Sequence, residues 1–409
     1  MHILFLTDNF PPETNAPASR TFEHARRWVK EGHRVTVITC APNFPAGRVF
    51  EGYRNQLRQV ESVEGIDVIR VWTYVTANEG FLRRSLDYAS FGLSALVAGL
   101  FVQGPDVIVA TSPQFFCACS GSLLAKLKRR PFVFELRDLW PDSILAVGAM
   151  RDSSMIRLLR RLEYALYRSA RRIVSVTESF RKVLTENGVD ASKIAVVPNG
   201  VDVDIYEPGT KPAFLEERYR LNGKFVAAYV GTVGMAHGLD VVLDCASLLR
   251  SRTEIAFVIV GTGAEREALE RRCHEQDLSN VLFTGHVSKA EVIGFWRLCD
   301  VALVLLRDAP LFEHVLPSKM FEAMGMERPI ILGVRGESRA VLERAGAGIA
   351  IPPGNAEALA AAVLQLAGDR ELSRRLGESG RRFVVDNYDR DFMARRMLAV
   401  LAEATSSKP

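Results

Sequence analysis

Short apolar stretches alternate with amphipathic, helix-length segments through the first 200 residues. Between the first two stretches, a helical pattern runs from about Ala18 to Glu31 and stops at Gly32, as expected of a βαβ unit. Most of the apolar stretches lack an alternating polar face, so we expect a parallel sheet covered on both sides. The predicted strands are His2–Thr7, Val35–Cys40, Asp67–Trp72, Asp106–Thr111, Phe132–Leu136, Ile173–Thr177 and Ile194–Val197.

The second half repeats this alternation. Its predicted strands are Phe225–Val230, Ile255–Val260, Val281–Thr284, Val301–Leu306, Pro329–Leu332 and Gly348–Ile351. The helices predicted between and after them are Glu265–His274, Lys289–Leu298, Pro317–Met324 and Ala356–Ala367. The fold class is therefore α/β, with two doubly wound, Rossmann-like domains that place a ligand at the carboxyl ends of their strands, in a shared central cleft.

The domain boundary falls where turn residues gather. Pro198–Pro208 is bounded by prolines and rich in turn formers, so it is predicted to be the linker. We expect domains at residues 1–200 and 201–385. Residues 386–409 carry a helical pattern and are expected to pack back on the first domain.

One apolar segment, Leu86–Val102, allows two interpretations. Its core is shorter than the roughly 20 residues that span a bilayer. It can be a buried helix of the first domain, or a helix that dips into the lipid headgroup layer, where the preceding Arg83 and Arg84 would suit it.

An excess of positive charge is found only in the first half of the chain. Residues 1–200 hold 26 Lys and Arg against 19 Asp and Glu, whereas residues 201–409 hold 26 against 29. This excess indicates either an anionic partner, such as a membrane surface or a lipid phosphate, or ordinary solvated helix faces. Nucleic acid is disfavoured because aromatic residues are not interleaved with the charges. The excess gathers in Lys126, Lys128, Arg129, Arg130, Arg157, Arg160, Arg161, Arg168, Arg171, Arg172, Arg181 and Lys182.

Several function classes lack their signatures. The six cysteines form no CxxC pair and the seven histidines show no ligand spacing, so no structural metal is expected. The start of the chain is not patterned as a signal peptide. The loop after the first strand has no GxGxxG, which argues against a nicotinamide or flavin enzyme.

The strongest candidate chemistry lies in Glu313–Leu332. Pro317 and Ser318 open a helix whose free N–H groups, with Lys319 beside them, form an anion site. Glu322 follows one turn later, on the same side. An anion site beside a carboxylate suits a nucleotide diphosphate and its ribose hydroxyls; the alternative is an ordinary surface helix.

Glycines at two other strand ends strengthen this interpretation, because they allow close backbone approach to a ligand. They are Gly231, Gly234 and Gly238 after one strand, and Gly261 and Gly263 after the next. The corner after the third strand offers backbone groups for a flat base, at His286 and Val287. All of these residues place nucleotide binding in the second domain.

Acceptor-side candidates follow strands of the first domain. Asp138 can orient or deprotonate an acceptor hydroxyl and Arg137 can bind an acceptor phosphate, unless the two simply pair with each other. Ser112 follows another strand. Asn15 and Arg20 lie in and after the first loop, where Arg20 is either a phosphate contact or a solvated arginine.

These motifs resemble a known family. The segments GTVGMAHGLD, IVGTGAERE, FTGHVSKAEV and SKMFEAMGMERPII look like the donor-binding half of retaining GT-B glycosyltransferases of family 4. The PP near the start, GHRVTVIT and FELRDLWPDS are similar to their first half. More narrowly, the chain resembles bacterial members that build O-antigen, capsule or exopolysaccharide, including N-acetyl-fucosamine transferases.

The resemblance assigns roles around an E-x7-E pattern. Glu322 matches the second Glu, which the family uses on the ribose hydroxyls. The first position is His314, so either His314 or the adjacent Glu313 would contact the donor sugar. Val315 and Leu316 complete this part of the expected donor site.

The diphosphate contacts also differ from the family. Where members often have Arg and Lys on the first glycine loop, this chain has Thr232 and His237, which are weaker neutral donors. Charge neutralisation therefore falls on Lys319 and the helix start, without a metal. Retaining transfer needs mainly electrostatics and positioning from the protein, rather than the paired carboxylates of a hydrolase.

The implied activity is retaining transfer of an N-acetylated hexosamine or 6-deoxyhexosamine. The donor would be a UDP-sugar and the acceptor a polyprenyl-diphosphate-linked saccharide of bacterial surface polysaccharide, with no further cofactor. The expected place is the cytoplasm, with peripheral attachment to the inner face of the plasma membrane. Two alternatives are a sugar-nucleotide epimerase on the same fold and a catalytically silent nucleotide-sugar-binding partner.

Overall fold

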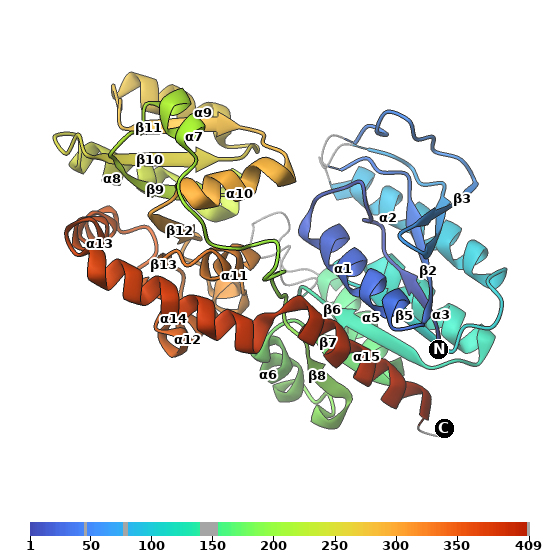
Figure 1. Ribbon diagram of the computed structural model, residues 1–409. Coiled ribbons are helices and arrows are strands. Elements are labelled where there is room, and N and C mark those ends of the chain that lie inside the picture. The colour runs from blue at the N-terminus through green and yellow to red at the C-terminus, as the bar shows by residue number, and fades with distance from the viewer. Residues whose placement is uncertain (45–46, 77–80, 140–153, 407–409) are drawn as a thin grey trace. The chain divides into compact units, whose positions relative to one another are not determined.

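The chain forms two compact units, which we describe separately. The computed structural model describes residues 1–44, 47–76, 81–139 and 154–406. The N-terminal unit comprises Met1–Asn199 together with Arg390–Pro409, and the C-terminal unit comprises Gly200–Asp389 (Figure 1). The described helices include none that is long and apolar enough to cross a bilayer.

The N-terminal unit is built on an eight-stranded sheet of order β3-β4-β2-β1-β5-β6-β7-β8. All neighbouring strands are parallel except β3 and β4. The parallel strands are almost entirely buried, as their continuous apolar runs predict. The strands are β1 (His2–Leu6), β2 (Arg34–Cys40), β3 (Arg58–Val63), β4 (Ile66–Val71), β5 (Val107–Thr111), β6 (Phe132–Leu136), β7 (Arg172–Ser175) and β8 (Ile194–Val196).

The edge strand β3 is absent from the sequence-based prediction. Its exposed and half-buried residues alternate, so it carries none of the apolar run that marks the other strands. It pairs with β4 through a two-residue turn at Glu64 and Gly65, whose φ angles of 47° and 82° suit the twist of a tight hairpin. The alternation and this turn were the signals available in the sequence.

Helices cover both faces of the sheet. The first begins at Ala16. The side-chain oxygen of the preceding Asn15 accepts a hydrogen bond from the Ala18 N–H at 2.9 Å and so caps the helix. The helical elements of this unit are α1 (Ala16–Lys30), α2 (Phe81–Leu100), α3 (Phe115–Lys128), α5 (Ser154–Ser169), α6 (Glu178–Glu186), η1 (Ala191–Lys193) and α15 (Arg390–Ser406).

The apolar segment that allowed two interpretations forms most of α2. Its inner side is core, with Phe91 and Ala95 buried. It packs so closely on α3 that a Cβ atom at Gly99 would lie 2.4 Å from a Leu124 methyl group. Its outer side is exposed, and 65% of Leu93 remains accessible. The buried-helix interpretation therefore holds for one side of α2 only.

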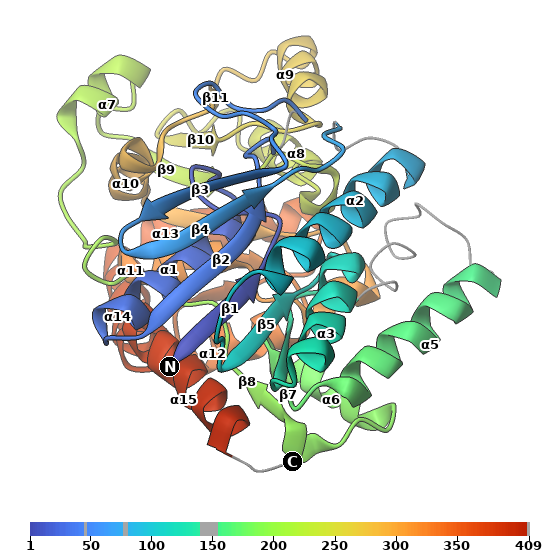
Figure 2. The same cartoon turned by 90° about the vertical axis from the view of Figure 1, so that its right-hand side faces the viewer.

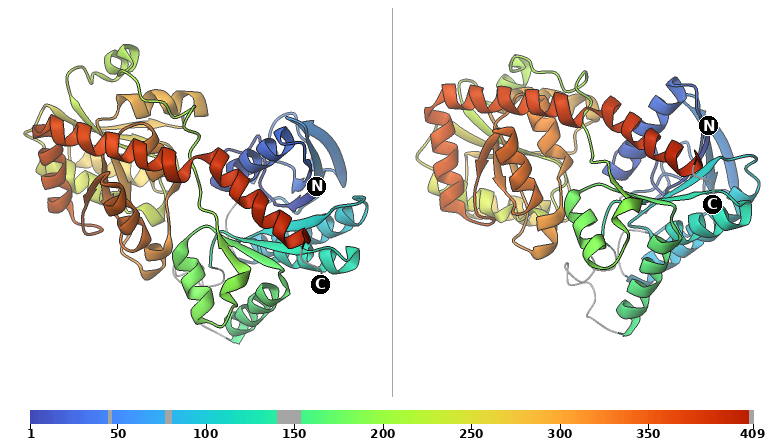
Figure 3. Two further views of the ribbon diagram at one scale, coloured as in Figure 1. Left: turned by 60° about the horizontal axis from the view of Figure 1, so that its bottom comes forward. Right: turned by 90° about the horizontal axis from the view of Figure 1, so that it is seen from below.

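The last helix, α15, belongs to the N-terminal unit, where it lies along α1 (Figure 3). The indole N–H of Trp28 donates to the Ala394 carbonyl at 2.9 Å, and both Trp28 and Met397 are fully buried. Arg390 pairs with Glu23 at 3.5 Å. Helix α15 therefore packs on α1 and completes one side of the hydrophobic core of the N-terminal unit.

The C-terminal unit has a six-stranded parallel sheet of order β11-β10-β9-β12-β13-β14. The strands are β9 (Phe225–Val230), β10 (Ile255–Val260), β11 (Val281–Gly285), β12 (Val301–Leu305), β13 (Ile330–Gly333) and β14 (Gly348–Ala350). Its helical elements are α7 (Ala213–Tyr219), η2 (Met235–His237), α8 (Asp240–Leu248), α9 (Arg266–Glu275), α10 (Lys289–Leu298), η3 (Pro310–His314), α11 (Ser318–Gly325), α12 (Glu337–Ala345), α13 (Ala356–Gly368) and α14 (Arg370–Tyr388).

The segment predicted as a linker is held firmly by the C-terminal unit after Asn199. The guanidinium of Arg381 donates to the carbonyls of Tyr206 at 2.6 Å and Val203 at 3.1 Å. The Val201 N–H donates to the Tyr388 carbonyl at 2.9 Å. The two places where the chain passes between units, after Asn199 and after Asp389, are therefore short.

Candidate functional site

Two glycine loops meet at the carboxyl edge of the second sheet. Gly231 after β9 and Gly261 after β10 have φ angles of 139° and 133°, which side chains rarely allow. A Cβ atom at Gly261 would lie 2.0 Å from the Gly231 carbonyl oxygen, and one at Gly263 2.2 Å from that of Val233. Both glycines are therefore required for the loops to approach each other.

This edge holds the point where the strand order reverses. The sheet runs from β9 outward to β10 and β11 on one side, and to β12 and β13 on the other. In doubly wound sheets, ligands bind at the carboxyl ends of the strands beside this reversal. The Gly231 loop follows β9, and η3 and α11 follow β12.

Lys319 provides the main positive charge there. Its ammonium nitrogen lies 3.7 Å from the centroid of the Tyr229 ring, and a Cβ atom at Gly231 would be 2.9 Å from it. The nitrogen is buried, and no group in the described part of the chain forms a hydrogen bond with it. Burial lowers the pKa of Lys319 to about 7, although Glu322 acts in the opposite direction. A buried donor without a partner is costly, so a bound anion would stabilise this arrangement.

Tyr229 arranges the groups around Lys319. Its hydroxyl donates to the Thr232 carbonyl at 2.6 Å, and its ring meets the His237 ring edge-on at 5.7 Å. His237 also lies 3.2 Å from the Gly234 carbonyl through Nδ1. Burial and then the charge of Lys319 lower the pKa of His237 to about 4, so the imidazole is neutral at pH 7.

Glu322 lies one turn into α11 and is fixed by a tryptophan. The indole N–H of Trp296, in α10, donates to a Glu322 carboxylate oxygen at 3.3 Å. The start of α11 at Ser318 follows Pro317, which caps no N–H group with its side chain. Among the described residues, no side chain caps the first turn of α11, so this turn offers N–H groups to a ligand beside Lys319 and Glu322.

The segment before α11 is fixed through its backbone. Gly336 has a φ of 68°, and a Cβ there would lie 2.0 Å from the Glu313 carbonyl oxygen. The Ser338 hydroxyl donates to the Val315 carbonyl at 2.5 Å. Leu316 is buried, whereas the Glu313 side chain is exposed and His314 is half-buried.

His286 and Val287 follow the third strand end, at β11. His286 is exposed and Val287 is half-buried. The turn is fixed by Ser288 and Glu291, which cap α10 reciprocally. A backbone bridge between Gly261 and Gly285 joins this corner to the second glycine loop.

In the N-terminal unit, Arg20 proves to be a structural residue. Its side chain is 4% exposed and pairs with the buried Glu135 at 2.8 Å. Its remaining N–H groups donate to the carbonyls of Pro198 and Val197, each at 2.8 Å. The solvated interpretation is therefore wrong, and the guanidinium is already engaged by protein groups. Arg20 therefore links α1 to β6 and to the residues that follow β8.

The other acceptor-side candidates gather at the carboxyl ends of β5 and β6. The Ser112 hydroxyl oxygen accepts from the N–H groups of Arg137 at 2.8 Å and Asp138 at 3.3 Å. Arg137 donates to the Pro17 carbonyl at 3.2 Å, and burial lowers its pKa to about 10. Asn15 is occupied as the cap of α1.

Asp8, the second residue after β1, also lies at this edge. Gln114 donates to its carboxylate through the side-chain amide. Burial, followed by the charges of Glu13 and Asp87, raises the pKa of Asp8 to about 8. A carboxyl group that titrates near neutrality at a strand end can exchange protons with a substrate.

Two family models match this chain in succession. The model described as "Glycosyl transferase 4-like domain" matches residues 15–200, and the one described as "Glycosyl transferases group 1" matches residues 213–383. Together they cover most of both units, including all the candidate residues predicted from the sequence. The chain belongs to the family 4 glycosyltransferases.

Relatives and solved structures agree with this assignment. The chain is 27% identical to the putative colanic acid biosynthesis glycosyl transferase WcaI of Escherichia coli, over 89% of this chain and 92% of the relative. It is 26% identical to the probable glycosyltransferase WbjE of Pseudomonas aeruginosa, over 74% and 75%. The fold matches sucrose-phosphate synthase from Thermosynechococcus elongatus, with a TM-score of 0.81, 16% identity and 100% of both chains covered.

A second structural neighbour was solved with a nucleotide sugar. The complex of Anabaena Alr3699/HepE with UDP-glucose has a TM-score of 0.73 and 17% identity, covering 98% of this chain and 100% of that one. At such identities the likeness concerns the fold, which is therefore GT-B.

The sequence pattern does not single out three residues that lie at the candidate sites: Tyr229, Trp296 and Asp8. Tyr229 lies inside a predicted strand and Trp296 inside a predicted helix, so both looked like core. Asp8 stood in a loop that was singled out, yet no spacing marked it above its neighbours. A polar residue directly beyond a strand's carboxyl end was the available signal.

Proposed function

We propose that this glycosyltransferase moves a sugar, with retention, from a UDP-sugar to a polyprenyl-diphosphate-linked saccharide in bacterial surface polysaccharide synthesis. The sugar would be an N-acetylated hexosamine or 6-deoxyhexosamine. Support comes from relatives named for colanic acid biosynthesis and for an O-antigen chain, and from a neighbour solved with UDP-glucose.

The observation that carries the donor site is the unpartnered, buried ammonium of Lys319. It lies beside the free N–H groups of α11 and beside Gly231, which leaves room for a close approach. A diphosphate placed there would give Lys319 its missing partner and restore its full charge. Glu322, one turn further along α11, would then accept hydrogen bonds from the ribose hydroxyls.

The proposed chemistry asks the protein for electrostatic stabilisation. The bond from the anomeric carbon to the diphosphate oxygen breaks while the acceptor oxygen bonds to the same face of that carbon. The acceptor proton passes to the departing phosphate. Lys319 and the start of α11 stabilise the charge on that phosphate without requiring a metal. His314 or Glu313 would contact the sugar, and Thr232 and the neutral His237 would donate weaker hydrogen bonds.

The acceptor is proposed to bind at the carboxyl edge of the N-terminal unit. Ser112 fixes the backbone of Arg137 and Asp138. In this proposal Arg137 would bind an acceptor phosphate and Asp138 the acceptor hydroxyl. Asp8, which keeps its own proton at pH 7, would donate a hydrogen bond to an acceptor oxygen there.

Donor binding can be tested by thermal shift with UDP-sugars and GDP-mannose, because a true donor stabilises the fold by mass action. GDP-mannose belongs in the screen because a mannosyltransferase of Mycobacterium tuberculosis that is 27% identical over 51% of this chain is described as dependent on it. A shift with UDP-sugars alone supports the proposal, and a shift with GDP-mannose alone contradicts its donor.

Transfer is tested with Lys319→Ala and Glu322→Gln. Losing a buried charge partner should weaken donor binding at least thirtyfold, and both variants should remain folded. Lys224→Ala and Glu275→Gln, in the same unit, are the matched controls. Full transfer by both site variants would refute the donor site. Sugar isomerisation without any acceptor would instead indicate an epimerase.

A further inference from the structure

Helices α2, α3 and α5 lie side by side over one face of the N-terminal sheet (Figure 2). On α2, Leu86, Leu93, Val97 and Leu100 are all exposed, at 45% to 65% of their surface. Their spacing of seven, four and three residues places them in one row along the helix. The opposite side of α2 is buried core, so this row is a second apolar side.

The neighbouring helices extend the apolar row. Leu123 and Leu127 of α3 are 45% and 57% exposed. Leu158 and Leu162 of α5 are 49% and 44% exposed. Leucines at such spacings on three adjacent helices form a broad apolar surface, which a soluble monomer rarely presents without a partner. We call this surface the α2–α3–α5 face.

Its charge is strongly one-sided. These three helices carry eight Lys and Arg but two carboxylates, Asp87 and Glu163. Both carboxylates are engaged inside the unit: Asp87 accepts from the Thr73 hydroxyl at 2.5 Å, and Glu163 is buried and accepts from that of Tyr167 at 2.5 Å. The described part of the face therefore presents cations alone.

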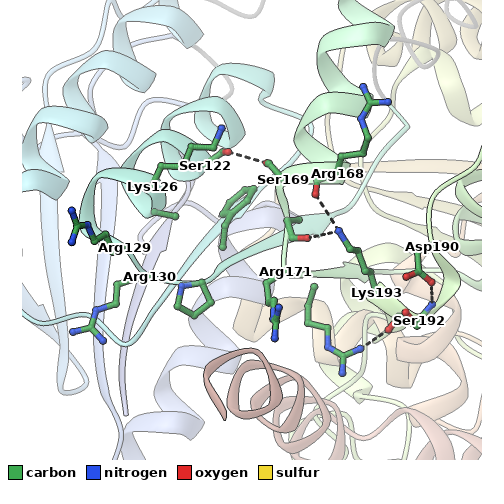
Figure 4. A pocket seen from close by; sticks show the side chains of 15 residues that line it. Ser122, Lys126, Arg129, Arg130, Arg168, Ser169, Arg171, Asp190, Ser192 and Lys193 are labelled. Atoms are coloured by element: carbon green, nitrogen blue, oxygen red, sulfur yellow. Dashed lines mark hydrogen bonds between the residues drawn. The ribbon is translucent and has the colours of Figure 1, made fainter. Parts of the chain in front are cut away.

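A basic hollow adjoins the carboxyl ends of α3 and α5 (Figure 4). It has a volume of about 640 Å³ and is lined by seven Lys and Arg but only one acid, Asp190, which accepts from the Ser192 N–H. Among the residues that the structure describes, no group pairs with the side chains of four of these cations: Lys126, Arg129, Arg130 and Arg168.

The hollow is separate from the candidate acceptor site. It is lined by Phe132 and Arg172, which begin β6 and β7, and by Lys193, which directly precedes β8. Ser112 and Arg137, by contrast, follow the carboxyl ends of β5 and β6. The hollow therefore lies at the amino ends of the parallel strands, and the candidate acceptor site lies at their carboxyl ends.

We propose that the α2–α3–α5 face docks on an anionic phospholipid surface, with the leucines among the acyl chains and lipid phosphates in the basic hollow. In apolar rows flanked by arginines, the leucines can contact the acyl chains while the arginines contact the phosphate headgroups. A soluble phosphate would explain the hollow but not the leucines, and a protein partner would not require the uniform positive charge. The inference deepens the proposed function, which needs an enzyme at a membrane for its lipid-linked acceptor.

Vesicle flotation of the full chain tests this without any sugar transfer. Vesicles with phosphatidylglycerol should bind the protein, and phosphatidylcholine alone should bind it much more weakly. Arg161→Ala with Arg168→Ala should weaken binding at least tenfold. Leu93→Gln with Leu123→Gln should also weaken it, and unchanged melting temperatures would show that the fold survives.

Matched controls come from the far edge of the same unit. Leu57→Gln and Arg58→Ala change exposed residues near β3 and should leave flotation unchanged. Lys319→Gln should also still bind vesicles, which separates this inference from the donor site. The proposal would be overturned if the protein bound both kinds of vesicle equally, or if the variants of the α2–α3–α5 face bound vesicles as well as the wild type. It would also be overturned if only pyrophosphate or RNA competed for the hollow.

Discussion

At the scale of single residues, Lys319 predicts a pH-dependent affinity. Burial lowers its pKa to about 7, and a diphosphate bound beside it would raise this pKa, so binding takes up a proton above pH 7. The Kd for UDP-glucose, whose diphosphate does not titrate in this range, should therefore rise up to about tenfold per pH unit from pH 7 to 9. Titration calorimetry should find weaker but pH-independent binding in Lys319→Gln. Equal slopes in both proteins would contradict this role of the lysine.

Asp8 predicts a pH dependence of stability with a definite sign. Its pKa is raised to about 8, so between about pH 4 and 8 the folded protein holds a proton that the unfolded chain has released. The stabilisation is complete below that range and is lost as pH rises through it, by up to about 1.4 kcal/mol per unit. Asp8→Asn, melted at several pH values, should show a flatter dependence. Asp67→Asn, at an exposed position, should keep the wild-type slope.

At the scale of elements, the sequence was most informative where apolar runs are continuous. The parallel strands of both sheets appear where they were predicted, because burial on both faces leaves no room for polar residues. Strand β3 was missed, since its alternating pattern on an exposed edge resembles a loop. For α2, the composition of the whole segment could not reveal that its apolar residues divide between a buried side and an exposed side.

The candidate site was predictable to a similar extent. The glycine loops and the start of α11 were found, because their residue types are dictated by the backbone. The pairing of Lys319 with the Tyr229 ring, and of Glu322 with Trp296, depends on which side of each element faces the site. Arg20 illustrates the converse. The sequence left this arginine of the first helix as either a phosphate contact or a solvated residue, because its buried partner, Glu135, lies more than 100 residues away in the chain.

The glycine loops make a prediction at this scale. Gly261→Ala should destabilise the C-terminal unit by more than about 2 kcal/mol, since its Cβ would meet the Gly231 carbonyl at 2.0 Å and its φ is 133°. Gly223→Ala is the matched control: its φ of 70° is also positive, but nothing lies within 4 Å of the added atom. It should cost about 1 kcal/mol. If urea denaturation showed that both variants lose the same free energy of unfolding, the contact between the loops would not be rigid.

At the scale of the whole molecule, the last helix should control the stability of the first unit. Met397 of α15 is fully buried, so Met397→Ala should lower the free energy of unfolding by about 2 to 4 kcal/mol. Phe392→Ala, on the same helix but 45% exposed, should cost much less. Hydrogen exchange should place the loosening caused by Met397→Ala in α1 and its neighbouring strands. Loosening confined to residues 200–389 would contradict the assignment of α15.

That arrangement also has a consequence for biosynthesis. The C-terminal unit is one unbroken stretch of chain, whereas the N-terminal unit needs residues from both ends. A nascent chain therefore cannot complete the N-terminal unit until residues 390–409 have been translated, although the C-terminal unit can form earlier. Until those residues have been made, the side of α1 that carries Trp28 lacks the cover of α15, so a nascent chain stalled before Arg390 should depend on chaperones.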